Sequence, residues 1–195
     1  PSSARRAAPR ALDWRRARPA LRLGMDQGRL TQLYTEHLRQ LEAAYAEALR
    51  EHGCDALVIH SGLPKQRTEF DDQFWPLRVT PHFQHWVPLA EADCALVIAA
   101  GKRPKLIWNR PPDFWETPPE VEGRHWQASF DLAEVSSPDA ARELLPQGRT
   151  VFIGEERGRA ASWGFAPEEV APKALVERLD QLRARKSAYE VLCLA

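Results

Sequence analysis

The sequence predicts an α/β fold, with a mixed sheet of about five to six strands flanked by helices. Three observations predict it. A long amphipathic stretch is followed by a short apolar run, two β-prone runs flank a Gly-containing turn, and a helical stretch separates two later apolar runs. A hairpin joins antiparallel strands, whereas a helix between strands allows a parallel crossover, so both kinds of pairing are expected in one sheet.

The first half of the chain supplies a helix, a strand and the hairpin. Apolar side chains recur at helical spacing over residues 28–52, and Gly53 is placed to end that helix. Residues 56–60 are a short apolar run typical of a buried strand, and His60 at its end is expected to be a hydrogen-bonded structural residue. The two hairpin strands are expected at 94–100 and 104–109.

The second half alternates between strands and helices. A weaker strand is expected at 130–135, where acidic residues interrupt the apolar pattern. Ser137 followed by proline is typical of a helix N-cap, so a short helix should begin there. Residues 150–154 form the clearest remaining strand, and helices are expected within 155–164 and 172–185.

Residues 1–24 are a basic leader that differs from the rest of the chain. They carry seven arginines against Asp13, a net charge of +6, and because the whole chain is neutral, residues 25–195 carry −6. Such a leader suits a mitochondrial transit peptide, a basic arm that grips nucleic acid, or sequence upstream of a natural start at Met25. The third interpretation is preferred because Met25 is the only methionine. The mildly acidic remainder predicts no nucleic-acid partner.

Composition places the chain in a class. Its 195 residues are 44% hydrophobic and 28% charged, which is typical of a soluble globular domain. Apolar runs fall short of the roughly 20 residues that span a bilayer, so no membrane partner is expected. Cys54, Cys94 and Cys193 are odd in number and widely spaced. This pattern fits a reducing compartment and argues against a disulfide framework.

A long irregular segment, residues 69–88, stands out. It holds five Phe and Trp side chains, three prolines, two histidines and the adjacent pair Asp71 and Asp72, without a period of two or 3.6. Water alone cannot solvate so many apolar rings, and the prolines lower the entropy lost on ordering. An ordered functional loop is therefore expected. The alternative is a loop whose rings pack onto their own domain.

Motifs for chemistry within the chain are lacking. We find no nucleophile elbow, no cysteine–histidine set, no phosphate loop and no dinucleotide fingerprint, so the expected catalytic residues are none. His82 and His85, with Asp71 and Asp72 nearby, have ligand-type spacing, but Pro81 argues against a helix that would put both histidines on one face. The expected metal ligands are therefore none. The two aspartates point to opposite sides of an extended chain and cannot readily act as an acid–base pair.

Residues 70–88, from Phe-Asp-Asp-Gln-Phe-Trp-Pro to His-Trp-Val-Pro, resemble the loop of the N-terminal, creatinase-like domain of bacterial Xaa-Pro dipeptidases (prolidases), members of the pita-bread metallopeptidase family. Stretches at 57–62, 104–115 and 186–193 agree with that family in the same order. The resemblance covers about residues 26–195. It implies a creatinase-like domain over 25–185 and the start of a metallopeptidase domain at 186–195.

This resemblance implies the non-catalytic N-terminal domain of a cytoplasmic homodimer, which caps the active site and restricts substrates to Xaa-Pro dipeptides. The metallopeptidase domain of such enzymes holds two divalent metal ions, usually Mn²⁺, so this fragment alone is expected to hold no cofactor and to be inactive. The resemblance also implies that Asp72 approaches the partner's pocket, where it could bind the substrate's free amino terminus. Phe74 and Trp75 would be wall residues beside it.

Two other functional classes stay open. One is a freestanding binding or assembly module of creatinase-like fold without a catalytic partner, although the apolar run at the end of the sequence argues against it. The other is a nucleic-acid binder that uses the arginines of residues 1–24, which salt-dependent binding lost on their deletion would support.

Overall fold

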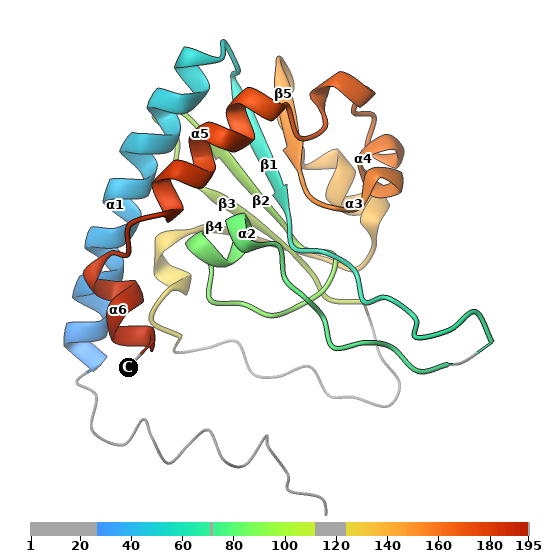
Figure 1. Ribbon diagram of the computed structural model, residues 1–195, viewed down its shortest axis with the longest axis horizontal. Coiled ribbons are helices and arrows are strands. Elements are labelled where there is room, and N and C mark those ends of the chain that lie inside the picture. The colour runs from blue at the N-terminus through green and yellow to red at the C-terminus, as the bar shows by residue number, and fades with distance from the viewer. Residues whose placement is uncertain (1–26, 71, 112–123, 195) are drawn as a thin grey trace, which may run out of the picture.

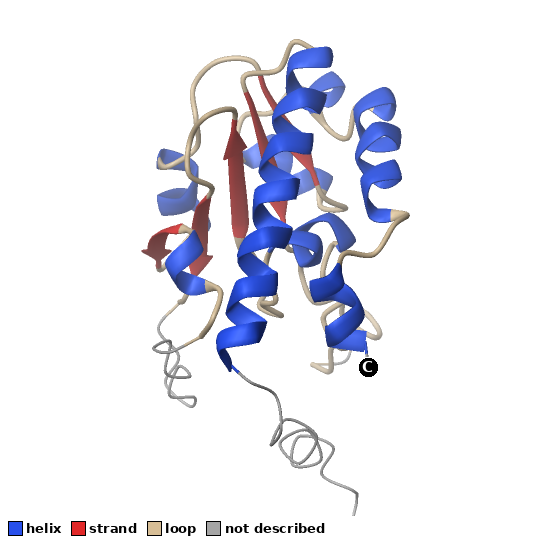
Figure 2. Ribbon diagram, turned by 90° about the vertical axis from the view of Figure 1, so that its left-hand side faces the viewer, coloured by secondary structure: helices blue, strands red, loops and turns tan. Residues whose placement is uncertain are grey.

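The computed structural model describes residues 27–70, 72–111 and 124–194, in which helices cover both faces of a five-stranded mixed sheet (Figures 1 and 2). The strand order is β4-β3-β2-β1-β5. The strands are β1 (Ala56–His60), β2 (Ala95–Ala99), β3 (Lys105–Asn109), β4 (Asp131–Val135) and β5 (Thr150–Ile153). The predicted fold class is confirmed.

Both kinds of strand pairing occur in the sheet. β1 pairs antiparallel with β2, and β2 pairs antiparallel with β3 as the predicted hairpin. β1 also pairs parallel with β5, and β3 pairs parallel with β4. The two parallel pairs therefore lie at the two edges, and the antiparallel pairs join them through the centre.

Helices divide between the two faces. They are α1 (Gln27–Glu51), α2 (Pro81–Trp86), α3 (Pro138–Glu143), α4 (Arg157–Ser162), α5 (Lys173–Arg183) and α6 (Ala188–Leu194). Alternate residues of β1 show the division, because Leu57 and Ile59 join the core under α1 and α5, whereas Val58 joins the core with α3 and α4. No helix in the described ranges is long and apolar enough to cross a bilayer.

The structure confirms the predicted helix cap at Ser137 but not the prediction made for Pro81. The Ser137 side chain accepts a hydrogen bond from the Ala140 N–H at 3.2 Å with Pro138 in the first turn, as expected. The expectation that Pro81 excludes a helix was wrong. Pro81 begins α2 at a position where the missing N–H costs nothing and the fixed φ suits the helix. The predicted leader, residues 1–24, lies outside the described residues.

A buried polar network closes the C-terminal end of β1. His60 Nε2 lies 2.8 Å from Asp93 Oδ1, while the Gly62 N–H donates to His60 Nδ1 at 3.1 Å. The proton of a neutral His60 therefore sits on Nε2 and is donated to Asp93. Arg159 on α4 donates to both Asp93 oxygens at 2.8 and 2.7 Å. The structural role expected for His60 is confirmed.

Burial alone would raise the pKa of the Asp93 carboxyl. The hydrogen bond from His60 and the positive charge of Arg159 outweigh burial and hold the pKa below its ordinary value of 3.8. Asp93 also adopts a positive φ of 58°, which a non-glycine residue rarely does. The network holds the residue in this conformation.

We expect Asp93→Asn to lower the free energy of unfolding by about 3 kcal/mol, because it leaves Arg159 without its buried counter-ion. Asp131→Asn is the control, since Asp131 forms an exposed ion pair with Lys105 at 3.7 Å and its loss should cost less than about 1 kcal/mol. Urea unfolding at pH 7 measures both. Equal losses would contradict the role of Asp93.

The same carboxylate predicts a pH dependence. Its folded pKa lies below the unfolded value, so its contribution is present above about pH 4 and is lost as the pH falls through the folded pKa. Unfolding measured from pH 6 downward should therefore show a steeper loss of stability for the wild type than for Asp93→Asn.

Candidate functional site

An arm formed by residues 65–70 and 72–75 projects from the end of the sheet at which β1 finishes (Figure 1). Its two sides pair with each other through an antiparallel bridge between Gln66 and Phe74. The Arg67 N–H donates to the Gln73 carbonyl at 2.9 Å, and the Trp75 N–H donates to the Lys65 carbonyl at 2.8 Å. The described part of the arm is therefore a hydrogen-bonded ribbon.

The two ends of the arm are tied together at Ser61. Its N–H donates to the Cys94 carbonyl at 2.8 Å, and its own carbonyl accepts from the Thr80 N–H at 2.8 Å. The Asp93 N–H donates to the Gly62 carbonyl at 2.9 Å. The arm thus leaves and re-enters the domain at a root that the Asp93 network holds.

Aromatic side chains of the 69–88 segment fall into two groups. Phe83 and Trp86 are fully buried, whereas Phe70 is 98% exposed, Phe74 49% and Trp75 57%. The Arg67 guanidinium lies over the Trp75 ring at 4.9 Å from its centroid. Packing onto the domain therefore explains the second half of the segment and leaves the rings of the arm on its surface.

The structure places the predicted site residues on this arm. Asp72 is exposed, and Phe74 and Trp75 follow it on the returning side of the ribbon. The three side chains thus share one projecting segment. The other member of the acidic pair, Asp71, lies outside the described residues.

A pocket of about 300 Å³ lies at the base of the arm, beside Trp75. Its walls are Gly62, Leu63, Lys65, Trp75, Pro76, Arg78, Thr80, Glu155 and Glu156. Lys65 pairs with Glu155 at 3.0 Å across the opening. Sequence reasoning missed both glutamates. They follow β5, which runs parallel to β1, so both strands deliver their following residues to the same edge.

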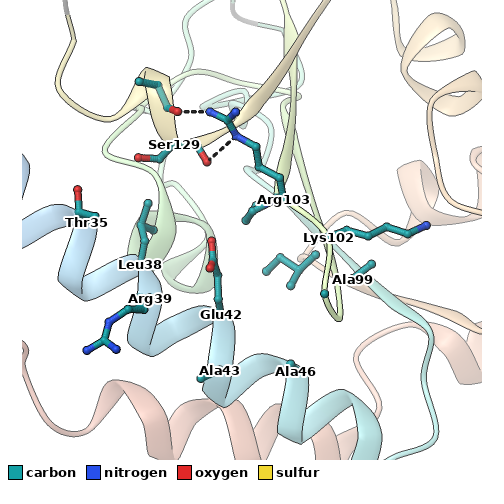
Figure 3. Close-up of a pocket in the computed structure, with 14 residues that line it drawn as sticks. Thr35, Leu38, Arg39, Glu42, Ala43, Ala46, Ala99, Lys102, Arg103 and Ser129 are labelled. Carbon is teal, nitrogen blue, oxygen red and sulfur yellow. Dashed lines mark hydrogen bonds between the residues drawn. The ribbon is translucent and has the colours of Figure 1, made fainter.

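A larger, open groove of about 830 Å³ lies between α1 and the β2–β3 turn (Figure 3). Two of its charged side chains, Arg39 and Arg103, are engaged with their own neighbours. Arg39 pairs with Glu36 at 2.8 Å, and Arg103 donates to the backbone carbonyls of Ala128 and Ser129. The arm and the pocket at its base are therefore the better candidate site.

His82 and His85 do not turn toward the arm. His82 Nε2 lies 3.4 Å from Asp180 on α5, and His85 Nε2 lies 3.9 Å from Glu190 on α6. Burial lowers the pKa of His82, and it lowers the pKa of His85 to about 4, so a neutral ring is expected for both at pH 7. Both histidines belong to the body of the domain, whereas Asp72 belongs to the arm.

Comparisons with known proteins identify the family of this chain. The family model described as Xaa-Pro dipeptidase, N-terminal domain, matches residues 32–181. Xaa-Pro dipeptidases of Pseudoalteromonas atlantica and Yersinia pestis are 36% and 33% identical over 168 residues, which cover 85% of this chain. The chain spans only 37% and 38% of the length of these two relatives.

Among solved structures, Escherichia coli aminopeptidase P with the inhibitor Pro-Leu matches with a TM-score of 0.42 and 16% identity. The match covers 78% of this chain and 33% of that one. A similarity this weak carries no information about the site.

A substitution at Gly62 would test whether the root of the arm is rigid. Its φ is +111°, and an added Cβ would lie 3.3 Å from the Arg78 carbonyl oxygen. We expect Gly62→Ala to cost about 3 kcal/mol of stability and to speed tryptic cleavage in the arm. Gly101→Ala is the control, with a φ of +70° and open space around the added carbon, and should cost about 1 kcal/mol without exposing the arm. Equal effects would contradict a rigid root.

Proposed function

This chain belongs to the Xaa-Pro dipeptidase N-terminal domain family, and from that membership we propose that it is the non-catalytic N-terminal domain of a longer Xaa-Pro dipeptidase. In that protein the domain caps the active site and helps to restrict substrates to dipeptides that end in proline. The observation that carries the proposal is the rooted arm, which holds Asp72 beside exposed Phe74 and Trp75.

The described residues do not fit a dinuclear metal centre of the kind implied for such an enzyme. The group of possible ligands that they bring together consists of two histidines and one glutamate, without the several carboxylates that would bridge two ions. The proposal therefore assigns two divalent metal ions, with Mn²⁺ as the expected metal, to the remainder of the longer protein. The domain's own part is to shape and close the pocket.

The proposal includes a homodimer in which the arm of one subunit meets the other subunit. Three apolar rings on one hydrogen-bonded segment favour such an interface, because exposed aromatic clusters are typical of association surfaces. The pairing within the arm means that little backbone order must be gained on binding. The three cysteines are free thiols, which supports the proposed cytoplasmic location.

Asp72 would bind the free amino terminus of the substrate in the partner's pocket. A carboxylate pairs with an ammonium group through a charge-assisted hydrogen bond, and that bond strengthens where aromatic walls exclude water. Such a contact would hold the amino terminus at a fixed distance from the scissile bond. It would therefore select substrates in which Xaa is the first residue.

Light scattering over a concentration series tests the dimer. We expect the 195-residue chain to associate reversibly, and Phe74→Ser with Trp75→Ser to raise the dimer dissociation constant at least tenfold, because both rings lose contact area. Leu132→Ser on β4 is the control, since Leu132 is also exposed but lies away from the arm. A monomeric mass at every concentration would contradict association through the arm alone.

Kinetics of the full-length protein test Asp72. We expect Asp72→Asn to raise KM for Xaa-Pro dipeptides by about tenfold or more, because an ion–ion contact becomes a neutral one. The KM for an acyl-proline analogue without the α-amino group should stay unchanged. Glu69→Gln, an exposed acid on the same arm, is the control and should alter neither value. An equal rise for both substrates would contradict recognition of the amino terminus.

A further inference from the structure

The group of two histidines and one glutamate lies inside the domain, where α1, α2 and α6 meet. His37, His85 and Glu190 each offer one ligand atom, and these three atoms lie within 4.8 Å of one another. Both histidines are buried, and Glu190 is partly buried. The proposed peptidase function does not use this group.

His85 lacks the partners that a buried imidazole normally has. Its Nδ1 is buried without a hydrogen-bond partner in the described part of the chain. Its Nε2 lies 3.9 Å from Glu190 Oε2, which is too far for a hydrogen bond. Two ligands of one ion, each about 2.1 Å from the metal, would lie roughly 3.4 to 4.2 Å apart, so this spacing suits a shared ion.

His37 is oriented by a hydrogen bond from its ring. Its Nε2 lies 2.7 Å from the backbone carbonyl of His85, and a carbonyl can only accept, so Nε2 carries the proton. The lone pair of the neutral ring is then on Nδ1. Histidine ligands commonly donate their second ring N–H to a carbonyl in this way, because the bond fixes the tautomer and the ring orientation.

Glu190 is fixed at the start of α6. Its Oε2 accepts the Ser187 N–H at 2.9 Å, and the Ser187 hydroxyl accepts the Glu190 N–H at 3.2 Å, which is a capping box. Lys186 Nζ lies 3.0 Å from Oε1. Each carboxylate oxygen has further acceptor capacity. The charges of Lys186 and Arg183 act on His85 and oppose a cation, so they limit affinity.

Two imidazoles and one carboxylate are the ligands of zinc sites with an open fourth position. Ca²⁺ and Mg²⁺ prefer oxygen ligands and fit this set poorly. We propose that His37, His85 and Glu190 form a mononuclear site for Zn²⁺, or for Co²⁺ as its spectroscopic substitute, that ties α6 to α1 and α2. The ligand atoms, which lie within 4.8 Å of one another, would have to move closer together around the ion.

Calorimetric titration of the metal-free 195-residue chain with ZnCl₂ tests the site. We expect one ion per chain, and affinity at least tenfold lower in His85→Phe, which keeps a planar ring of similar shape but removes both nitrogens. His82→Phe is the control, because His82 is also buried on α2 but faces Asp180. Circular dichroism of the metal-free variants checks that each is folded. Unchanged affinity in His85→Phe, or no saturable binding by the wild type, would overturn the site.

Thermal unfolding and Co²⁺ absorption supply independent readouts. At one Zn²⁺ concentration, the rise in Tm should be similar for the wild type and His82→Phe and clearly smaller for His85→Phe. Bound Co²⁺ should show visible bands of a nitrogen–oxygen site that Glu190→Gln weakens. A thiolate charge-transfer band would place the metal on Cys54 or exposed Cys193 and would overturn the assignment.

Discussion

The architecture depends on the contact of Asp93 with His60 and Arg159. Asp93 lies in the turn just before β2, His60 ends β1 and Arg159 lies on α4, so the three residues are distant in the sequence. A buried carboxylate is costly unless it is paired and hydrogen-bonded, so each partner restricts where the other two can lie. The Asp93 backbone also binds Gly62. The network thus joins the sheet and α4 to the point where the arm begins.

The root of the arm explains how residues 69–88 can place some aromatic rings in the core and others on the surface. Up to Thr80 the chain belongs to the arm and its base, and beyond it the chain enters α2, whose Trp86 ring packs edge-on against Tyr45 in the core. The Tyr34 hydroxyl donates to the Trp86 carbonyl and holds the helix down. Burying the second half of the segment anchors the first half, so Trp75 can stay exposed on a defined backbone.

Local patterns were sufficient for most of the fold, because α1 and the apolar strands bury faces that their spacing reveals. They failed at α2, a helix of six residues whose stability comes from tertiary contacts and whose Pro81 looked like a breaker. The prediction of Asp72, Phe74 and Trp75 as site residues rested on family resemblance. An irregular segment has no hydrophobic period, so its sequence does not show which side chains face the domain and which face outward. The pocket that contains Glu155 and the group of His37, His85 and Glu190 are each formed by residues far apart in the sequence. Tertiary packing brings these residues together, so no local sequence motif predicts either site.

Contacts through α2 connect two separated parts of the domain. The arm and α6 lie on opposite sides of the molecule (Figure 1). α2 joins them, because the residue before it, Thr80, bonds to the root at Ser61, and His85 near its end faces Glu190. A continuous run of contacts therefore extends from α6 through His85 and α2 to the root of the arm at Ser61.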